Sequence, residues 1–144
     1  MKRLYLDVCT YCRPFDYQNF VERLESDAFF VIMQHVKDGR YQIMISPVHF
    51  KEVEAISPLN KDLKKALLNR FETKAVYDSK KAHNRAEELY ALRFGIVDAA
   101  HIAYAEQMAD VFISCDDGLL ERYQKISPSL PAMNPIAFSV SEGL

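Results

Sequence analysis

Four acidic residues have types and positions that suit a shared cation site: Asp7, Glu52, Asp98 and Asp116. Asp7 and Asp116 each follow a short apolar run that is typical of a buried strand. Glu52 lies six residues past Ser46, early in a segment with helical spacing. Asp98 stands inside a helical segment made mostly of small and apolar residues. Whether the four carboxylates meet depends on the elements that carry them.

Short runs rich in β-forming residues alternate with longer segments in which apolar residues recur every three or four positions. The runs that predict strands are residues 3–8, 41–46, 74–77, 111–115 and 136–140. This alternation predicts an α/β protein, a three-layer α/β/α sandwich with a central, mainly parallel sheet. Asp38-Gly39 predicts the end of the first long helix, Gly95 fits another helix C-terminus, and residues 127–135 predict a loop into the last strand.

Ligands of parallel α/β sheets bind beyond the carboxyl ends of the strands, where Asp7 and Asp116 are expected. Carboxylates gathered at such an edge raise each other's pKa, and a divalent cation removes the cost of their repulsion. Oxygen ligands favour Mg²⁺ or Mn²⁺, which take the rest of their shell from water and phosphate. The pattern therefore indicates a metal site able to activate water against a phosphodiester.

Each acid also has an ordinary structural explanation when it is taken alone. Asp116 or Asp117 would serve as the N-cap of a helix that begins near Gly118. Asp98 would be a first-turn acid favoured by the helix dipole. Glu52, with a second acid at Glu54, would be an ordinary solvated helix residue. Only the set of four supports a functional hypothesis.

Four segments of the chain resemble the PIN-domain ribonucleases, which include the toxins of VapBC-type toxin–antitoxin pairs. These segments are residues 4–7, 45–52, 95–103 and 112–116, and their order and spacing fit the family over residues 1–140. The resemblance implies a metal-dependent endoribonuclease with a PIN-like fold, RNA as substrate, a homodimer and an antitoxin protein as partner. It places Asp7 and Asp98 closest to the metal, with Asp116 and Glu52 completing the site or orienting water.

The resemblance has departures around the acids. The family often has Asn or Ser two residues after the first Asp, where this chain has Cys9, so we expect Thr10 to supply the nearby hydroxyl. Asp117 competes with Asp116 as a ligand, and Glu54 competes with Glu52. His101, one turn after Asp98, is expected to be a packed or hydrogen-bonded histidine and not a ligand.

The charge distribution indicates where RNA would bind. Lys and Arg number 18 and Asp and Glu 20, a net charge of −2, but residues 60–85 carry +5 and the rest of the chain −7. The basic stretch is either a solvated helical face or a rim that contacts RNA phosphates. Arg13 and Arg93, together with Thr10, are the further candidates for substrate binding.

Two other functions compete with the nuclease hypothesis. Cys9-Thr10-Tyr11-Cys12 after a strand is a C-x-x-C pattern typical of a thioredoxin-like redox site. That hypothesis leaves the acids without a shared purpose and needs a strand after Pro47, where the sequence predicts a helix over residues 48–56. A zinc site with Cys115 lacks a second ligand pair. The remaining alternative is a non-catalytic PIN-like module that binds RNA or protein.

Composition places the chain among globular proteins, with 49% hydrophobic and 26% charged residues over 144 positions. We expect a single domain over residues 1–144, because this length is close to the commonest domain size. The longest apolar run, residues 28–33, is too short to cross a membrane, and an odd number of cysteines favours a reducing cytoplasm. Aromatic residues of the first helical region are expected to form core, a homodimer face or an antitoxin groove: Phe15, Tyr17, Phe20, Phe29 and Phe30.

Overall fold

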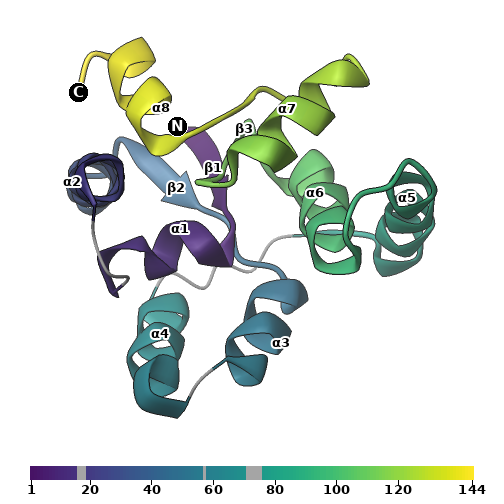
Figure 1. Ribbon diagram of the computed structural model, residues 1–144, viewed down its shortest axis with the longest axis horizontal. Helices are drawn as coiled ribbons and strands as arrows, with labels where there is room; N and C mark the ends of the chain where they lie inside the picture. The colour runs from purple at the N-terminus through teal and green to yellow at the C-terminus, as the bar shows by residue number, and fades with distance from the viewer. Residues whose placement is uncertain (16–18, 57, 71–75) are drawn as a thin grey trace.

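The computed structural model describes residues 1–15, 19–56, 58–70 and 76–144 (Figure 1). Within them, four parallel strands form one sheet: β1 (Lys2–Leu6), β2 (Tyr41–Ile43), β3 (Val111–Ile113) and β4 (Ala132–Met133). The helices of the same part of the chain are α1 (Val8–Cys12), α2 (Phe20–Lys37), α3 (Pro47–Ala55), α4 (Pro58–Arg70), α5 (Ser79–Ala91), α6 (Ile96–Met108), α7 (Asp117–Lys125) and α8 (Pro135–Glu142). The expected α/β architecture is confirmed, and helices lie on both faces of the sheet.

The two faces of the sheet bury different side chains because successive strand residues point in opposite directions. Leu4 and Leu6 pack with α2 and α8 in one core cluster. Tyr5 and Phe112 point the other way and pack with α6 and α7 in a second cluster. The central strands β1 and β3 are therefore apolar on both faces, as expected for a parallel sheet covered twice. In Figure 1, α2 and α8 lie on one side of the sheet and α5, α6 and α7 on the other.

The strand order β2-β1-β3-β4 creates a topological switch point between β1 and β3. The chain leaves β1 toward β2 on one side, whereas it leaves β3 toward β4 on the other. The two connections diverge at the carboxyl ends of β1 and β3, which opens a crevice in parallel α/β sheets. The residues that follow these two strands are Asp7 and the segment 114–116, so the fold places the acids where ligands bind.

One expected strand is wrong, the described half of another is not in a strand, and one strand was not expected. Residues 136–140 lie inside α8, which Asn134 caps and Pro135 begins. The last strand is β4, two residues within the segment expected to be a loop. Val76 and Tyr77 are not in a strand, whereas residues 74 and 75 of that expected strand lie outside the described residues.

The expected end of a helix at Gly95 is also corrected, because Gly95 is the N-cap of α6. The preceding helix, α5, ends at Ala91 with Leu92 as its C-cap, and the next residue, Arg93, has a φ of 73°. The N–H of Phe94 donates to the carbonyl of Leu89 and the N–H of Arg93 to that of Tyr90, at 3.2 and 3.0 Å. This is a Schellman motif with Arg in the left-handed position that usually holds glycine. At the end of α2, Gly39 takes the corresponding position as expected, with a φ of 85°.

Helix α2 exposes an apolar stripe. It buries Phe29 and Ile32 against the sheet, but Phe20 is 69% exposed and Leu24 is 42% exposed. Phe15 and Phe30 are also exposed, and Tyr17 lies outside the described residues. Part of the aromatic group is therefore core and part is surface.

None of the described helices is both long and apolar enough to cross a membrane.

Candidate functional site

Asp7 is the most tightly held of the four acids. It is 5% exposed and caps the N-terminus of α1, where its Oδ1 accepts the Thr10 N–H at 3.2 Å and the Thr10 hydroxyl at 2.8 Å. The Cys9 thiol lies 3.0 Å from the same oxygen. These bonds hold the Asp7 carboxylate fixed in position at the end of β1.

Ser114 joins Asp7 to the acid that follows β3. Its buried hydroxyl donates to Asp7 Oδ2, and Ser114 Oγ itself accepts the Asp116 N–H at 3.0 Å. Asp116 caps α7 by accepting the Leu119 N–H at 3.0 Å, which confirms the N-cap expectation for this residue. One serine thus connects the two strand ends at the switch point.

Asp98 lies in the first turn of α6, and the charges of the other three acids affect the pKa of its carboxyl. Burial raises the pKa of Asp98 first, and the charges of Asp116, Asp7 and Glu52 raise it further, while His101 opposes the shift. Like charges act this way only over short separations in a poorly solvated setting. The charges of the other three acids that the sequence singled out therefore all act on Asp98.

The competing acids point elsewhere. Asp117 is exposed in the first turn of α7, and its charge acts on the buried Glu25 beside α1. Glu54 is exposed on α3, whereas the Glu52 side chain is 25% exposed and hydrogen-bonded. These placements favour Asp116 over Asp117 and Glu52 over Glu54 as members of the acidic group.

Glu52 belongs to a buried polar network that sequence patterns did not indicate. His101 Nε2 lies 3.3 Å from Glu52 Oε2, and His101 Nδ1 lies 2.7 Å from the Tyr5 hydroxyl. The Tyr5 hydroxyl in turn lies 2.7 Å from Ser46 Oγ. His101 is 1% exposed, which confirms the expectation of a packed, hydrogen-bonded histidine.

A second histidine continues this network to the end of β1. His49 Nδ1 accepts the Ser46 N–H at 3.0 Å, and His49 Nε2 lies 2.6 Å from the carbonyl oxygen of Leu6. Burial first, and then the charge of His101, lowers the pKa of His49 to about 3. His49 is therefore neutral and structural: it completes the capping box of α3 and ties that helix to the residue before Asp7.

The three expected substrate-binding residues differ in their surroundings. Thr10 is fully buried behind Asp7, so its hydroxyl supports the carboxylate and does not reach the surface. Arg13 Nε lies 3.4 Å from Glu25 Oε1, with 18% of the Arg13 side chain exposed. Arg93 is exposed at the turn before α6, two residues from its N-cap. Arg93 is thus the best placed of the three to contact a ligand.

The cysteines give the redox hypothesis little support. None of Cys9, Cys12 and Cys115 forms a disulfide. Burial and the neighbouring Asp7 raise the pKa of Cys9, and burial raises the pKa of Cys115 to about 12. A reactive redox thiol needs the opposite shift, toward the thiolate. The segment after Pro47 is helix α3, as expected, and not the strand that a redox fold requires.

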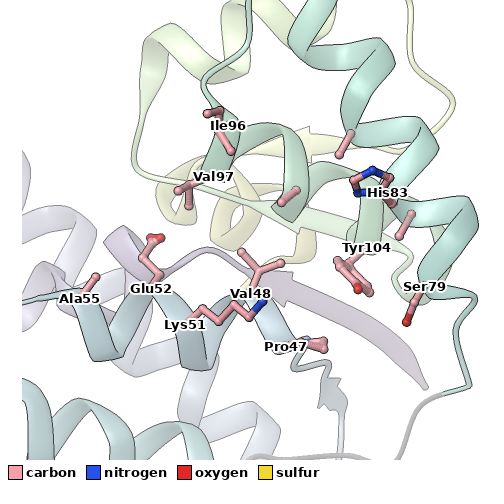
Figure 2. A pocket seen from close by; sticks show the side chains of 13 residues that line it. Pro47, Val48, Lys51, Glu52, Ala55, Ser79, His83, Ile96, Val97 and Tyr104 are labelled. Atoms are coloured by element: carbon pink, nitrogen blue, oxygen red, sulfur yellow. The ribbon is translucent and has the colours of Figure 1, made fainter.

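A pocket of about 410 Å³ opens beside Glu52, between α3 on one side and α5 and α6 on the other (Figure 2). Its walls are mostly aliphatic, with Val48, Ile96 and Val97 among them. Glu52 lies at one end, and Tyr104 and His83 lie at the other. Glu52 is shared by the pocket and the acidic group, so a ligand that fills the pocket lies next to the acids.

The acidic group suits a hard cation that keeps much of its water. Across the described residues, no three carboxylate, imidazole or thiol groups converge closely enough to coordinate an ion as they stand. The charges of Asp7, Glu52 and Asp116 nonetheless raise the pKa of Asp98, so the four carboxylates interact electrostatically without converging on one point. Mg²⁺ typically binds one or two carboxylates and completes its shell with water and phosphate. Asp7, Asp98 and Asp116 would be the candidates to hold such an ion, one or two of them directly and the others through its water.

The basic stretch is divided between two helices that Figure 1 shows well apart, α4 and α5. On α5, Lys80 and Lys81 are exposed. On α4, Lys65 is exposed but Lys64 is only 9% exposed. The expected rim is therefore two separate patches, of which the one on α5 adjoins α6, the helix of Asp98.

No protein-family model matches this chain, and no curated protein matches it.

Proposed function

We propose that this protein is a ribonuclease that hydrolyses RNA phosphodiester bonds at the acidic group, with Mg²⁺ or Mn²⁺ as its cofactor. The observation that carries the proposal is the hydrogen-bonded link through Ser114 between Asp7 and Asp116, at the switch point of the sheet. The charges of these two acids and of Glu52 also raise the pKa of Asp98. Repulsion among such carboxylates costs stability unless a cation is bound.

The residues divide the work according to their surroundings. Asp7, held by the α1 cap, is the fixed ligand, and Asp98 and Asp116 complete the set of ligands. The carboxylate of Glu52 is partly exposed at one end of the pocket, where it can orient a water molecule or accept the proton of that water. The metal, when bound, supplies Lewis-acid polarisation of a phosphate and lowers the pKa of a coordinated water.

RNA is the substrate class that the surroundings favour. Arg93, exposed just before α6, provides a cation for a phosphate beside the acidic group. Lys80 and Lys81 lie near Gln107 at the other end of α6, where they would contact RNA further from the acids. The aliphatic pocket with the ring of Tyr104 offers walls for an unstacked base next to Glu52. Single-stranded RNA presents bases in this unstacked form, whereas duplexes hide them.

A protein partner is the second part of the proposal. The exposed stripe with Phe20 and Leu24 on α2 is the surface we assign to a second copy or to an antitoxin protein. Sedimentation of the purified protein reports a homodimer directly. A Phe20→Ser Leu24→Ser variant that stays dimeric would remove this surface from the proposal.

The activity is tested by incubating the purified protein with mixed single-stranded RNAs in Mg²⁺, Mn²⁺ or EDTA. We expect cleavage in either metal and none in EDTA. In Asp7→Asn and in Asp98→Asn, the rate of RNA cleavage should fall on the order of 100-fold or more, because each substitution removes a proposed metal ligand. The control is Glu121→Gln, an exposed carboxylate of α7 whose ion pair with Lys125 lies on the surface. Cleavage that persists in EDTA or in both site variants would refute the proposal.

A further inference from the structure

The hydrogen bonds between Glu52 and the end of β1 form one continuous buried chain. They run from Glu52 through His101, Tyr5 and Ser46 to His49 and the carbonyl of Leu6. The chain joins β1, α3 and α6, the three elements that carry or precede Asp7, Glu52 and Asp98. Its interior members are at most 1% exposed, so water does not satisfy them.

The backbone fixes the direction of donation at one end of the chain. The Ser46 N–H can only donate, so His49 Nδ1 must accept and His49 Nε2 must carry the proton given to Leu6. Because His49 Nδ1 is already occupied, the Ser46 hydroxyl gives its proton to Tyr5 at 2.7 Å. The Ser46 oxygen keeps an acceptor site for the Val48 N–H at 3.3 Å.

The remaining directions follow in order. Tyr5 accepts from Ser46, so its own hydroxyl proton is given to His101 Nδ1. With Nδ1 accepting, His101 carries its proton on Nε2, which faces Glu52 Oε2 at 3.3 Å. The opposite direction would place a lone pair of His101 against the facing oxygen of Glu52. Both ends of the chain therefore agree on one tautomer.

We propose that His101 is a positioning residue for Glu52, and that Tyr5 and Ser46 set the tautomer in which it donates. The proposal rests on the nuclease function assigned to the acidic group. The His101 Nε2–H donates to Oε2 of Glu52 and so orients the carboxylate. Oε1 is then left for the pocket that Glu52 lines. Without this donor, Glu52 is an ordinary helix side chain with free rotamers and a poorly defined place in the site.

The kinetic test is a pair of substitutions that separate the two ring nitrogens. His101→Gln can place an amide N–H near the Nε2 position, whereas His101→Asn reaches only the Nδ1 position, beside Tyr5. We expect His101→Asn to lower kcat by about 10–100-fold with KM unchanged, and His101→Gln to recover about tenfold of the loss. Equal losses in the two variants, or a loss confined to KM, would overturn the proposal.

A double-substitution cycle then asks whether His101 acts through Glu52. In a Glu52→Gln background, His101→Asn should lower kcat by less than about twofold, because the side chain it positions no longer works as a carboxylate. Independent, multiplicative losses would show that His101 supports the fold in general. Thermal unfolding of the single variants identifies any that fail to fold.

A measurement on the wild-type protein keeps this inference separate from the enzyme activity. The ¹⁵N shifts of the His101 ring report which nitrogen is protonated, with or without RNA cleavage. We expect the Nε2–H tautomer in the wild-type protein and a mixture of tautomers in Tyr5→Phe. An Nδ1–H tautomer would overturn the proposed chain even if the protein is a nuclease. Absence of cleavage together with the Nε2–H tautomer would refute the nuclease and leave the chain intact.

Discussion

The hydroxyl of Ser114 donates to the carboxylate of Asp7 across the boundary between β1 and β3. The two residues are separated by 107 positions in the chain, yet they meet at the switch point of the sheet. The same serine oxygen accepts the N–H of Asp116. This arrangement fixes two of the four acids relative to each other, so Ser114 is a sensitive place to perturb the site.

Ser114→Ala should destabilise the protein by about 1–3 kcal/mol, because it leaves Asp7 Oδ2 and the Asp116 N–H without their buried partner. Metal-dependent activity should fall by about 10–100-fold through the misplaced ligands. The matched control is Ser139→Ala, whose buried Oγ has no hydrogen-bond partner among the described residues. Urea unfolding of both variants provides the measurement, and equal stability for the two would contradict the role of Ser114.

Tyr5→Phe and Tyr11→Phe make a second matched pair. Both hydroxyls are buried, but Tyr5 binds Ser46 and His101, whereas the Tyr11 hydroxyl finds no partner in the described part of the chain. Loss of the Tyr5 hydroxyl should cost about 1–3 kcal/mol, since it strands two buried polar groups. Loss of the Tyr11 hydroxyl should be neutral or stabilising. A larger loss for Tyr11→Phe in chemical denaturation would show that the network contributes nothing.

Asp98→Asn should stabilise the protein at pH 7. The pKa of Asp98 is raised above its usual 3.8 by burial and by the neighbouring acids, so the folded state binds more protons than the unfolded state just above that pH. The free energy of unfolding therefore falls as pH rises through this window, and the penalty is complete at pH 7. Asparagine removes it, so the advantage of the variant should shrink as pH falls toward 4. Urea titrations at the two pH values measure this difference.

Asp110→Asn is the control with the opposite sign. The hydrogen bond from Arg3, at 3.0 Å, lowers the pKa of Asp110, so its charge stabilises the folded state above the usual pKa of 3.8. This variant should lose stability at pH 7 and resemble the wild type as pH falls toward and below the lowered pKa. If Asp98→Asn followed the same course as Asp110→Asn, the acidic group would not be crowded as described.

Arg93→Gly should raise stability by about 1 kcal/mol, because Arg93 occupies the left-handed position of a Schellman motif. The reverse change at the equivalent position, Gly39→Ala, should lower stability by a similar amount. Differential scanning calorimetry gives both shifts. Weaker RNA binding by the stabilised Arg93→Gly variant would separate the contribution of the Arg93 side chain to the substrate from its cost to the fold. No gain in stability would argue against the helix end described here.

The sequence predicted the parts of this fold that local periodicity encodes. The strands before Asp7 and Asp116 are short, continuous apolar runs between polar residues, a pattern that predicts both the strands and the acids at their ends. Residues 136–140 alternate apolar and small side chains as a strand does, yet Asn134 and Pro135 form a helix start that outweighs that pattern. Strand β4 has two residues and no periodicity at all.

The helix end and the buried network were missed for a different reason. Only glycine or asparagine marks a left-handed C-terminus in a sequence, so Arg93 gave no signal and Gly95 was assigned to the wrong side of the turn. The chain from Glu52 to Leu6 depends on contacts between β1, α3 and α6, which no spacing rule places together. The capping pair Ser46 and His49 was a visible clue to one link of it.

The chemistry of the cleaved ends tests the central claim most directly. A single-stranded RNA is incubated with the protein and Mg²⁺, beside Asp98→Asn and Glu121→Gln, and the new 3′ ends are identified by mass spectrometry. Water-driven hydrolysis at the acidic group predicts products without a cyclic phosphate, formed by the wild type and Glu121→Gln but not by Asp98→Asn. Products that end in a 2′,3′-cyclic phosphate arise by attack of the RNA's own 2′-hydroxyl, and their formation at equal rates in all three proteins would contradict the account.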